Sequence, residues 1–210
     1  MTFKTEQESF WAGQFGDDYI TRNTGQQLLA YNLDFFVRAM RQAHGVSSVI
    51  EFGANVGMNL KALQLLYPDQ QHHGIEINDQ AAAQLGKVIE PDHVINGSIL
   101  DFKPTRVWDM VLIKTVLIHI NPAELPQVYE ALYRCAGQYI LVAEYYNPTP
   151  VEVSYRGHSQ RLFKRDFAGD LMAAYPDLRL IDYGFIYRHD PVMPQDDITW
   201  FLMRKTGVSV

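Results

Sequence analysis

Apolar residues recur along this chain with two different spacings, which together predict alternating helices and strands. In Gln26–Ala43 they fall every three or four positions, the spacing of an amphipathic helix. Trp108–Ile113 is almost entirely apolar, as expected for a strand that is buried on both faces. The same patterns predict strands at Val46–Phe52, His73–Ile77, His93–Ile95 and Tyr139–Ala143, and helices at Met58–Tyr67, from the N-cap Asp79 to Leu85, and from Pro122 through Ala136.

The order of these elements predicts the fold class. Strands that alternate with helices over short spacings are typical of an α/β fold with a mostly parallel sheet and helices on both faces. After the Pro-rich segment Asn147–Pro150, a helix is expected at Lys164–Tyr175. Leu178–Tyr187 and Thr199–Arg204 are then expected to form an antiparallel hairpin at the sheet edge. We expect one domain over residues 26–210.

The N-terminal segment is aromatic and is interrupted by two glycines. Trp11, Phe15 and Tyr19 would share one stripe of a helix, and most such stripes simply contact a core. The glycines weaken a rigid helix, which also suits a movable lid. We therefore predict that residues 1–25 form a cap or lid, which would bring Arg22 to the carboxylate of a bound cofactor.

A glycine turn, Gly53–Gly57, follows the first strand. Ligands of open parallel sheets bind at the carboxyl ends of the strands, near the point where the strand order reverses. Gly53 can adopt the positive φ of a tight turn, and Gly57 lets the next helix and a ligand approach closely. A dinucleotide fingerprint requires glycines where Asn55 and Met58 stand. The turn therefore favours a ligand without a pyrophosphate, and S-adenosylmethionine (SAM) is one.

An acidic residue at the end of the second strand supports the same ligand. Glu76 lies about 20 residues after the turn, where a carboxylate can accept hydrogen bonds from both ribose hydroxyls. Ser98 and Ile99 follow the third strand and would face the edge and the plane of the adenine. Taken one at a time, these features are also those of simple turns and of a surface glutamate at a strand end.

The segment after the fourth strand is expected to pass beside the reacting methyl group. It contains His119, and a histidine with an ordinary pKa can remove a proton from a hydroxyl or amine nucleophile. A lone histidine in an apolar turn is more often a structural hydrogen-bonding residue, so both roles stay open. Methyl transfer itself mainly requires the alignment of nucleophile, methyl group and sulfur.

Composition and charge narrow the range of partners. The chain has 210 residues, 47% of them hydrophobic, and a net charge of −6, which fits a globular protein and disfavours nucleic acid. Its longest apolar stretch, Met110–Ile120, is too short to span a bilayer, and the chain begins without a signal segment. We expect a cytoplasmic protein with no membrane partner. The spacing of His, Asp and Glu predicts no metal site.

Five segments resemble the methyltransferases associated with pseudaminic acid biosynthesis, a family of class I SAM-dependent methyltransferases. They are Phe10–Asn23, Val116–Pro122, Glu144–Pro148, Tyr155–His158 and Leu162–Phe167. The resemblance implies a Rossmann-like fold with a seven-stranded, mostly parallel sheet whose last strand is antiparallel. It also implies a role in nonulosonic acid or surface-glycan metabolism, and it leaves the acceptor atom open.

The strand positions and the resemblance together give the candidate site residues. The candidate catalytic residues are His119 and Tyr145. The candidate acceptor contacts are Tyr155, Arg156, Lys164 and Arg165, whose basic members suit a carboxylate or phosphate but also suit a solvated helix start. The candidate contacts to SAM, or to its product S-adenosylhomocysteine (SAH), are Trp11, Tyr19, Arg22, Glu51, Gly53, Ala54, Asn55, Gly57, Asn59, Glu76, Ile77, Ser98, Ile99, Lys114, Thr115 and His119.

These expectations lead to one function and leave three alternatives. We predict a SAM-dependent methyltransferase, a monomer or homodimer, that methylates an oxygen or nitrogen atom of a small anionic sugar. That sugar would be a nonulosonic acid such as pseudaminic acid, its nucleotide-activated form or a precursor. The alternatives are an NAD(P)-type oxidoreductase, which Asn55 disfavours, a non-catalytic SAM-binding protein of this fold, and a methyltransferase for tRNA or protein, which the acidic charge disfavours.

Overall fold

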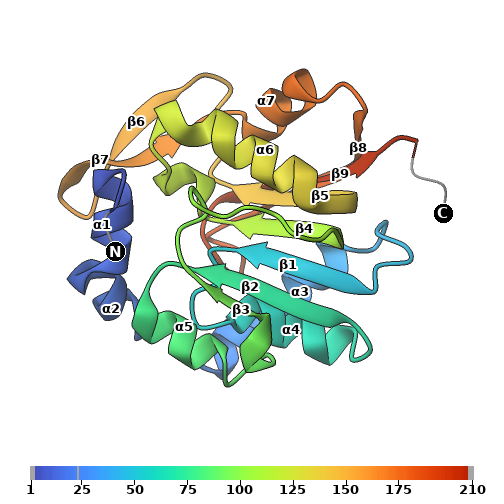
Figure 1. Ribbon diagram of the computed structural model, residues 1–210, viewed down its shortest axis with the longest axis horizontal. Coiled ribbons are helices and arrows are strands. Elements are labelled where there is room, and N and C mark those ends of the chain that lie inside the picture. The colour runs from blue at the N-terminus through green and yellow to red at the C-terminus, as the bar shows by residue number, and fades with distance from the viewer. Residues whose placement is uncertain (1–2, 23, 208–210) are drawn as a thin grey trace.

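The computed structural model, which describes residues 3–22 and 24–207, has a seven-stranded sheet between two layers of helices (Figure 1). The strand order is β3-β2-β1-β4-β5-β9-β8. Neighbouring strands from β3 to β5 are parallel, and β9 is antiparallel to both β5 and β8. The strands are β1 Ser48–Phe52, β2 Gln71–Glu76, β3 Val94–Asn96, β4 Trp108–Lys114, β5 Ala136–Glu144, β8 Leu178–Ile186 and β9 Ile198–Lys205. The predicted fold class is therefore confirmed.

Alternate residues of the central strands face the two helical layers. In β1, Ile50 and Phe52 pack with α6 and α7, while Val49 packs with α3 and α4. None of the helices in residues 3–22 and 24–207 is long and apolar enough to cross a membrane. The helices are α1 Glu6–Ala12, α2 Gln14–Ile20, α3 Gln26–Ala39, α4 Met58–Leu66, α5 Asp79–Leu85, α6 Leu125–Cys135 and α7 Phe167–Ala174, with short 3₁₀ turns η1 Pro91–His93, η2 Leu117–His119 and η3 Pro122–Glu124.

Most predicted elements exist, with shifted boundaries. Helix α3 ends at Ala39, before the predicted Ala43, and His93 belongs to a 3₁₀ turn instead of β3. The N-cap of α5 is Asn78, not the predicted Asp79, because the Asn78 side chain accepts the Ala81 N–H at 2.9 Å. These differences arise at element ends, where short capping contacts decide the boundary.

The segment after the Pro-rich break differs most from the prediction. Lys164 ends a strand, so the expected helix Lys164–Tyr175 begins only at Phe167, where Asp166 caps it by accepting the Gly169 N–H at 2.8 Å. Two strands precede it, β6 (Val151–Tyr155) and β7 (His158–Lys164), and they form a separate antiparallel hairpin. The connecting Arg156 and Gly157 both have positive φ, as hairpin turns of this length require.

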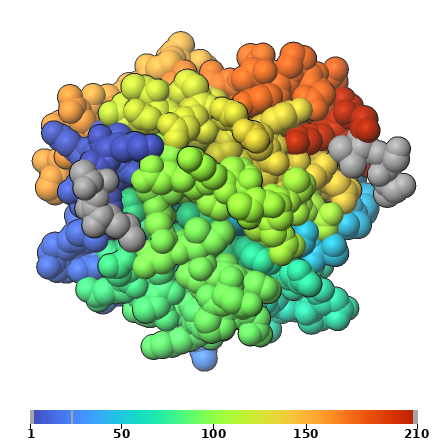
Figure 2. All heavy atoms as spheres, in the orientation of Figure 1, coloured from blue at the N-terminus to red at the C-terminus, as the bar shows by residue number. Residues whose placement is uncertain are grey.

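The N-terminal segment folds as two short helices instead of one continuous stripe. α1 and α2 meet at Gly13, and a Cβ atom on Gly16 would lie 1.9 Å from the Trp11 carbonyl oxygen, so the chain can turn tightly here. The three aromatic rings still cluster, with Trp11 5.3 Å from Phe15 and 5.2 Å from Tyr19 between ring centroids. Both helices lie across the carboxyl ends of the strands (Figure 1). They also contact the β6–β7 hairpin, through Gln7 of α1 and Phe15 of α2, and lie beside it on the surface (Figure 2). Asn23 lies outside the described residues.

Because two histidines are buried, we expect the free energy of unfolding to fall in acid. Burial, with a smaller contribution from the nearby His93, lowers the pKa values of His72 and His73 to about 4 from the ordinary 6.5. Between these pKa values the unfolded chain binds more protons than the folded one, so the free energy of unfolding must fall as the pH drops from 6.5 towards 4.

Denaturant titrations at a series of pH values will measure this slope. A His72→Gln variant, which cannot titrate at that position, should show a shallower slope between pH 6.5 and 4. The exposed His44 offers the matched control, since His44→Gln should leave the slope unchanged. Equal slopes for wild type and His72→Gln would contradict the assignment.

Candidate functional site

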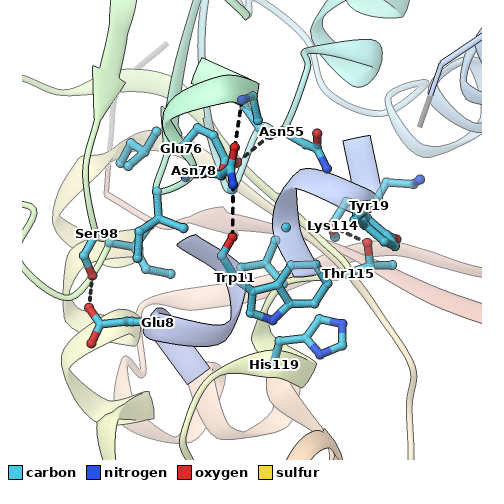
Figure 3. A pocket seen from close by; sticks show the side chains of 18 of the residues that line it. Glu8, Trp11, Tyr19, Asn55, Glu76, Asn78, Ser98, Lys114, Thr115 and His119 are labelled. Carbon is cyan, nitrogen blue, oxygen red and sulfur yellow. Dashed lines mark hydrogen bonds between the residues drawn. The ribbon is translucent and has the colours of Figure 1, made fainter. Parts of the chain in front are cut away.

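A cavity lies at the carboxyl ends of β1 to β4, beneath α1 and α2 (Figure 3). It forms at the point where the strand order reverses between β1 and β4, where ligands of open α/β sheets bind. Most of the predicted cofactor contacts line it. These are Trp11, Tyr19, Gly53, Ala54, Asn55, Asn59, Glu76, Ile77, Ser98, Ile99, Lys114, Thr115 and His119.

Among the described residues, four predicted cofactor or catalytic positions lie outside this lining. Arg22 is exposed after α2, away from the cavity wall. Glu51 is fully buried, and its Oε1 accepts a hydrogen bond from the side-chain amide of Asn59 at 2.6 Å. Gly57 instead serves packing, because a Cβ atom there would lie 2.7 Å from Leu85 Cδ1. The fourth, Tyr145, lies beside the cavity at the end of β5.

The glycine turn has the backbone conformation that its sequence predicts. Gly53 and Gly57 have φ values of 75° and 81°, and Asn55 itself has φ of 48°. Gly53 also packs closely against the segment that follows β4, since a Cβ atom at Gly53 would lie 2.5 Å from Val116 Cγ2. The turn therefore brings backbone groups, without intervening side chains, to the floor of the cavity.

Glu76 stands next to this turn with its carboxylate buried at the cavity wall. Its Oε2 accepts the Asn55 N–H at 2.7 Å, and its Oε1 accepts the Asn78 N–H at 2.8 Å. Burial raises the pKa of Glu76 above its usual range, and these N–H donors oppose that rise. A carboxylate has about four lone-pair positions, so Glu76 keeps capacity to accept a hydroxyl hydrogen bond from a ligand.

At the β3 end, the cavity wall includes a residue that the sequence patterns did not single out. Ser98 donates its hydroxyl to Oε1 of Glu8, which belongs to α1 and is 7% exposed. Glu8 also closes a capping box with Thr5, whose side chain accepts the Glu8 N–H at 3.2 Å. The spacing of Thr5 and Glu8 is a helix-start signal in the sequence, although it does not indicate the contact with Ser98.

Beyond the turn, α3 and β4 contribute polar groups to the opposite end of the cavity. Asn32, Asn59 and Lys114 all line it. Burial raises the pKa of Glu51 to about 8 and lowers that of Lys114, whose ammonium lies 5.4 Å from the centre of the Phe35 ring. The negative charge of Glu51 partly offsets the lowering at Lys114. This end can therefore hold a group that carries both an amine and a carboxylate.

His119 lies between aromatic rings at the roof of the cavity. Its ring centroid is 4.6 Å from that of Trp11 and 4.9 Å from that of Tyr155. Nδ1 donates to the carbonyl oxygen of Arg161 at 2.5 Å, which leaves Nε2 as the acceptor nitrogen. Burial lowers the pKa of His119 to about 4, so the ring is neutral near pH 7 and can accept a hydrogen bond.

The segment that carries His119 is held by a buried carboxylate at the end of β5. One oxygen of Glu144 accepts the N–H groups of Val116 and Leu117, each at 2.9 Å. Thr115, directly before them, has φ of 56°, an uncommon conformation for a β-branched residue. Glu144 therefore fixes the path from β4 to His119, a role that the sequence patterns did not indicate.

Three of the four predicted acceptor contacts, Tyr155, Arg156 and Lys164, lie on the β6–β7 hairpin. The Lys164 ammonium lies 5.3 Å from the centre of the Tyr145 ring, and the Arg156 guanidinium lies 5.6 Å from that of Tyr155. Tyr145 donates its hydroxyl to Asp196 at 2.6 Å, a residue that the sequence patterns did not single out.

Arg165 does not join this group. It forms an ion pair with Asp170 at 2.7 Å, within the first turn of α7. Over residues 3–22 and 24–207, no set of three or more His, Cys, Asp or Glu residues is placed to hold a metal ion.

Several solved methyltransferases share the fold of this chain. The sugar N-methyltransferase KedS8 from Streptoalloteichus sp. ATCC 53650 superposes with a TM-score of 0.64 and 17% identity, over 92% of this chain and 93% of that one. The amino pentose methyltransferase CalS10 from Micromonospora echinaspora, with bound SAM, gives 0.63 and 12%, over 92% and 98%. The magnesium protoporphyrin IX methyltransferase ChlM from Synechocystis PCC 6803, also with bound SAM, gives 0.67 and 10%, over 98% and 100%.

At these identities the likeness establishes a shared fold, the Rossmann-like fold of SAM-dependent methyltransferases. No model of a protein family matches the sequence, and no curated protein matches it either. The resemblance to the methyltransferases of pseudaminic acid biosynthesis therefore stays a prediction.

Proposed function

We propose that this protein is a SAM-dependent methyltransferase that acts on a small anionic sugar. One observation carries the proposal: the Gly53–Asn55 turn and the buried Glu76 carboxylate meet at the wall of one cavity. A ribose bound there would meet a carboxylate with free lone pairs, and no side chain of the turn glycine would obstruct it. The shared fold supports the proposal, since CalS10 and ChlM contain bound SAM.

The residues that line the cavity fit the three parts of this cofactor. Glu76 would bind the ribose hydroxyls, and the β3 end with Ser98 and Ile99 would hold the adenine. Lys114 and Asn59 would face the carboxylate and the amine of the methionine part. In these pairings the Glu76 carboxylate accepts hydrogen bonds from hydroxyl donors, and the Lys114 cation faces the anionic carboxylate.

When bound, SAM supplies an electrophilic methyl group, and the chain's own residues would align the acceptor and receive its proton. Transfer would form the bond from the acceptor oxygen or nitrogen to the methyl carbon as the bond from carbon to sulfur is broken, so the residues of the cavity would have to hold these three atoms in line. We assign the acceptor's proton to Nε2 of His119, which is neutral and is oriented by the Arg161 carbonyl. Trp11 and Tyr155 pack against that ring and limit the access of water.

The acceptor site that we propose lies beside Tyr145. Lys164 supplies a cation at Tyr145 and Arg156 supplies one at Tyr155, and the two tyrosines offer aromatic faces for a sugar ring. These groups suit a sugar with a carboxylate, such as a nonulosonic acid of the pseudaminic type, its nucleotide-activated form or a precursor. KedS8 and CalS10, which share the fold, are described as methyltransferases of a sugar and of an amino pentose.

We also propose that α1 and α2 act as a lid over the cofactor. Asn78, the N-cap of α5, holds these two helices. Its side-chain amide donates to Asp17 at 2.8 Å and to the Trp11 carbonyl at 3.4 Å. Gln7 donates to the Gln160 carbonyl at 2.9 Å, and Glu6 pairs with Arg161 at 3.1 Å. Each contact is weak enough to open, and together they connect the lid to the hairpin of the acceptor site.

Two measurements test the proposal. Calorimetry with SAH and NAD⁺ should show binding of SAH alone, which would separate a methyltransferase from an oxidoreductase. Incubation with labelled SAM and a panel of sugar acids should then give a product heavier by the mass of one CH₂ group. Binding of NAD⁺ without SAH would reject the proposal, and SAH binding without turnover on any acceptor would favour a non-catalytic role.

Loss of either cation beside Tyr145 is expected to weaken acceptor binding. Arg156→Ala or Lys164→Ala should raise the acceptor KM by about tenfold, because a charge-assisted hydrogen bond contributes roughly 1.5–3 kcal/mol. Affinity for SAH should stay unchanged in both. Arg165→Gln serves as the matched control, since Arg165 pairs with Asp170 instead. An acceptor KM that stays unchanged in both Arg156→Ala and Lys164→Ala would place the acceptor elsewhere.

A further inference from the structure

We infer that Glu8, on the N-terminal helix α1, recognises the 6-amino group of the cofactor's adenine. The inference deepens the proposed function and rests on it, because it concerns the same cavity. Glu8 would make the lid a part of the cofactor site and would select an adenine nucleoside over other nucleosides.

The position of Glu8 follows from the order of groups along the cavity. The ribose carboxylate Glu76 ends β2, so a base attached to that ribose extends towards the neighbouring β3. The β3 end of the cavity is formed by Ser98 and Ile99, and Glu8 covers it from α1 (Figure 3). Glu8 thus stands at the edge of the space that a base would fill.

The two carboxylate oxygens of Glu8 have different surroundings. Oε2 accepts the N–H groups of Lys4 at 2.9 Å and Thr5 at 2.8 Å, together with the Thr5 hydroxyl at 3.2 Å. Oε1 accepts the Ser98 hydroxyl, which leaves it room for a second donor. The first set of bonds fixes the carboxylate, and the second oxygen is directed to the cavity side.

Gln7 provides an independent indication of a missing donor. Its side chain lines the same cavity and is 6% exposed, and its Nε2 donates to the Gln160 carbonyl at 2.9 Å. Its Oε1 is buried and has no hydrogen-bond partner within the described residues. Such a group is costly to bury unless a ligand supplies a donor. An adenine 6-amino group carries two N–H donors, and Glu8 Oε1 can accept one of them.

The chemistry of the carboxylate gives selectivity. An ionised carboxylate is an acceptor only, so it pairs with an exocyclic amine and is repelled by a carbonyl oxygen at the same position. A site whose polar groups are left unpaired rejects the wrong ligand more strongly than an apolar site does. We therefore expect adenine to be favoured over purines that lack the amine.

A conservative substitution can test this atom by atom. In a Glu8→Gln variant, the N–H groups of Lys4 and Thr5 require an oxygen at the Oε2 position, so the amide nitrogen takes the Oε1 position. The variant keeps the capping box, which accepts Gln as well as Glu, but presents a donor to the base. SAH and its purine analogue, with hydrogen in place of the 6-amino group, are then the two probes.

Calorimetry on the full chain measures the outcome. We expect the wild type to bind SAH about tenfold more tightly than the analogue, and Glu8→Gln to bind both within twofold of each other. Glu6→Gln is the matched control on the same helix, and it should keep the tenfold ratio. An unchanged ratio in Glu8→Gln overturns this inference alone, whereas a wild type that binds neither probe removes the proposed function as well.

Discussion

A Glu76→Ala variant is expected to bind SAH at least about 100-fold more weakly than the wild type. The carboxylate would accept both ribose hydroxyls, and each hydrogen bond to a charged group contributes roughly 1.5–3 kcal/mol. Two such bonds amount to a factor of about 100 or more in affinity. Because Glu76 also accepts the Asn55 and Asn78 N–H groups, the variant would lose some order in the glycine turn as well.

The contribution of the ribose contact can be separated from that of the turn. Glu76→Gln keeps the size of the side chain, and calorimetry with SAH and with its 2′,3′-dideoxy analogue compares ligands with and without the hydroxyls. The wild type should favour SAH strongly, and both variants should lose most of that preference. Thermal unfolding of the ligand-free proteins reports the structural effect. A variant that binds SAH within threefold of the wild type would refute the assignment of Glu76.

The parts of the site that sequence could predict are those encoded locally. Gly53 and Asn55 adopt positive φ within one turn, and Glu76 ends the neighbouring strand. Once the alternation of helices and strands is recognised, the parallel sheet brings these groups together without further information. Ser98 and Thr115, which follow the ends of β3 and β4, line the same cavity.

The parts that sequence could not predict depend on distant contacts. Glu8 reaches Ser98 across 90 residues, and Glu144 reaches Val116 across 28. Tyr145 and Asp196 meet across 51 residues. No periodicity indicates such pairings, because they arise from how α1, α2 and the loops pack on the sheet.

The sequence patterns do not predict the β6–β7 hairpin, for a different reason. Its turn, Arg156-Gly157, is not one of the common Asn-Gly or Asp-Gly hairpin pairs. The basic residues around Lys164 resembled a helix start, although the capping residue Asp166 lies two positions later. Arg165, predicted as an acceptor contact, belongs to the segment before α7 and pairs with Asp170.

A Gly53→Ala variant is expected to unfold at a temperature several degrees lower and to lose most of its affinity for SAH. A Cβ atom at Gly53 would lie 2.5 Å from Val116 Cγ2 and 3.2 Å from Cγ1, at a φ of 75° that an alanine rarely adopts. The left-handed conformation costs about 1–2 kcal/mol, and forcing an extra methyl group into a packed site costs about 1–3 kcal/mol.

Val116 cannot readily move away to relieve this contact. Its N–H donates to Glu144 at 2.9 Å, and the same oxygen holds Leu117, so the segment is fixed on both sides of the clash. The turn would therefore have to shift, and it would carry Asn55 away from Glu76, with which its backbone is bonded. Stability and cofactor binding should fall together because one backbone segment serves both.

The matched control for Gly53→Ala is Gly86→Ala, at the C-cap of α5. A Cβ atom there would meet its nearest neighbour at 3.7 Å, and its φ of −65° suits alanine. This variant should unfold at or above the wild-type temperature, because alanine lowers the entropy of the unfolded chain. Thermal unfolding with and without SAH measures both effects. If the two variants gave the same melting temperature and the same shift with SAH, the turn at Gly53 would not be the rigid floor that the cavity requires.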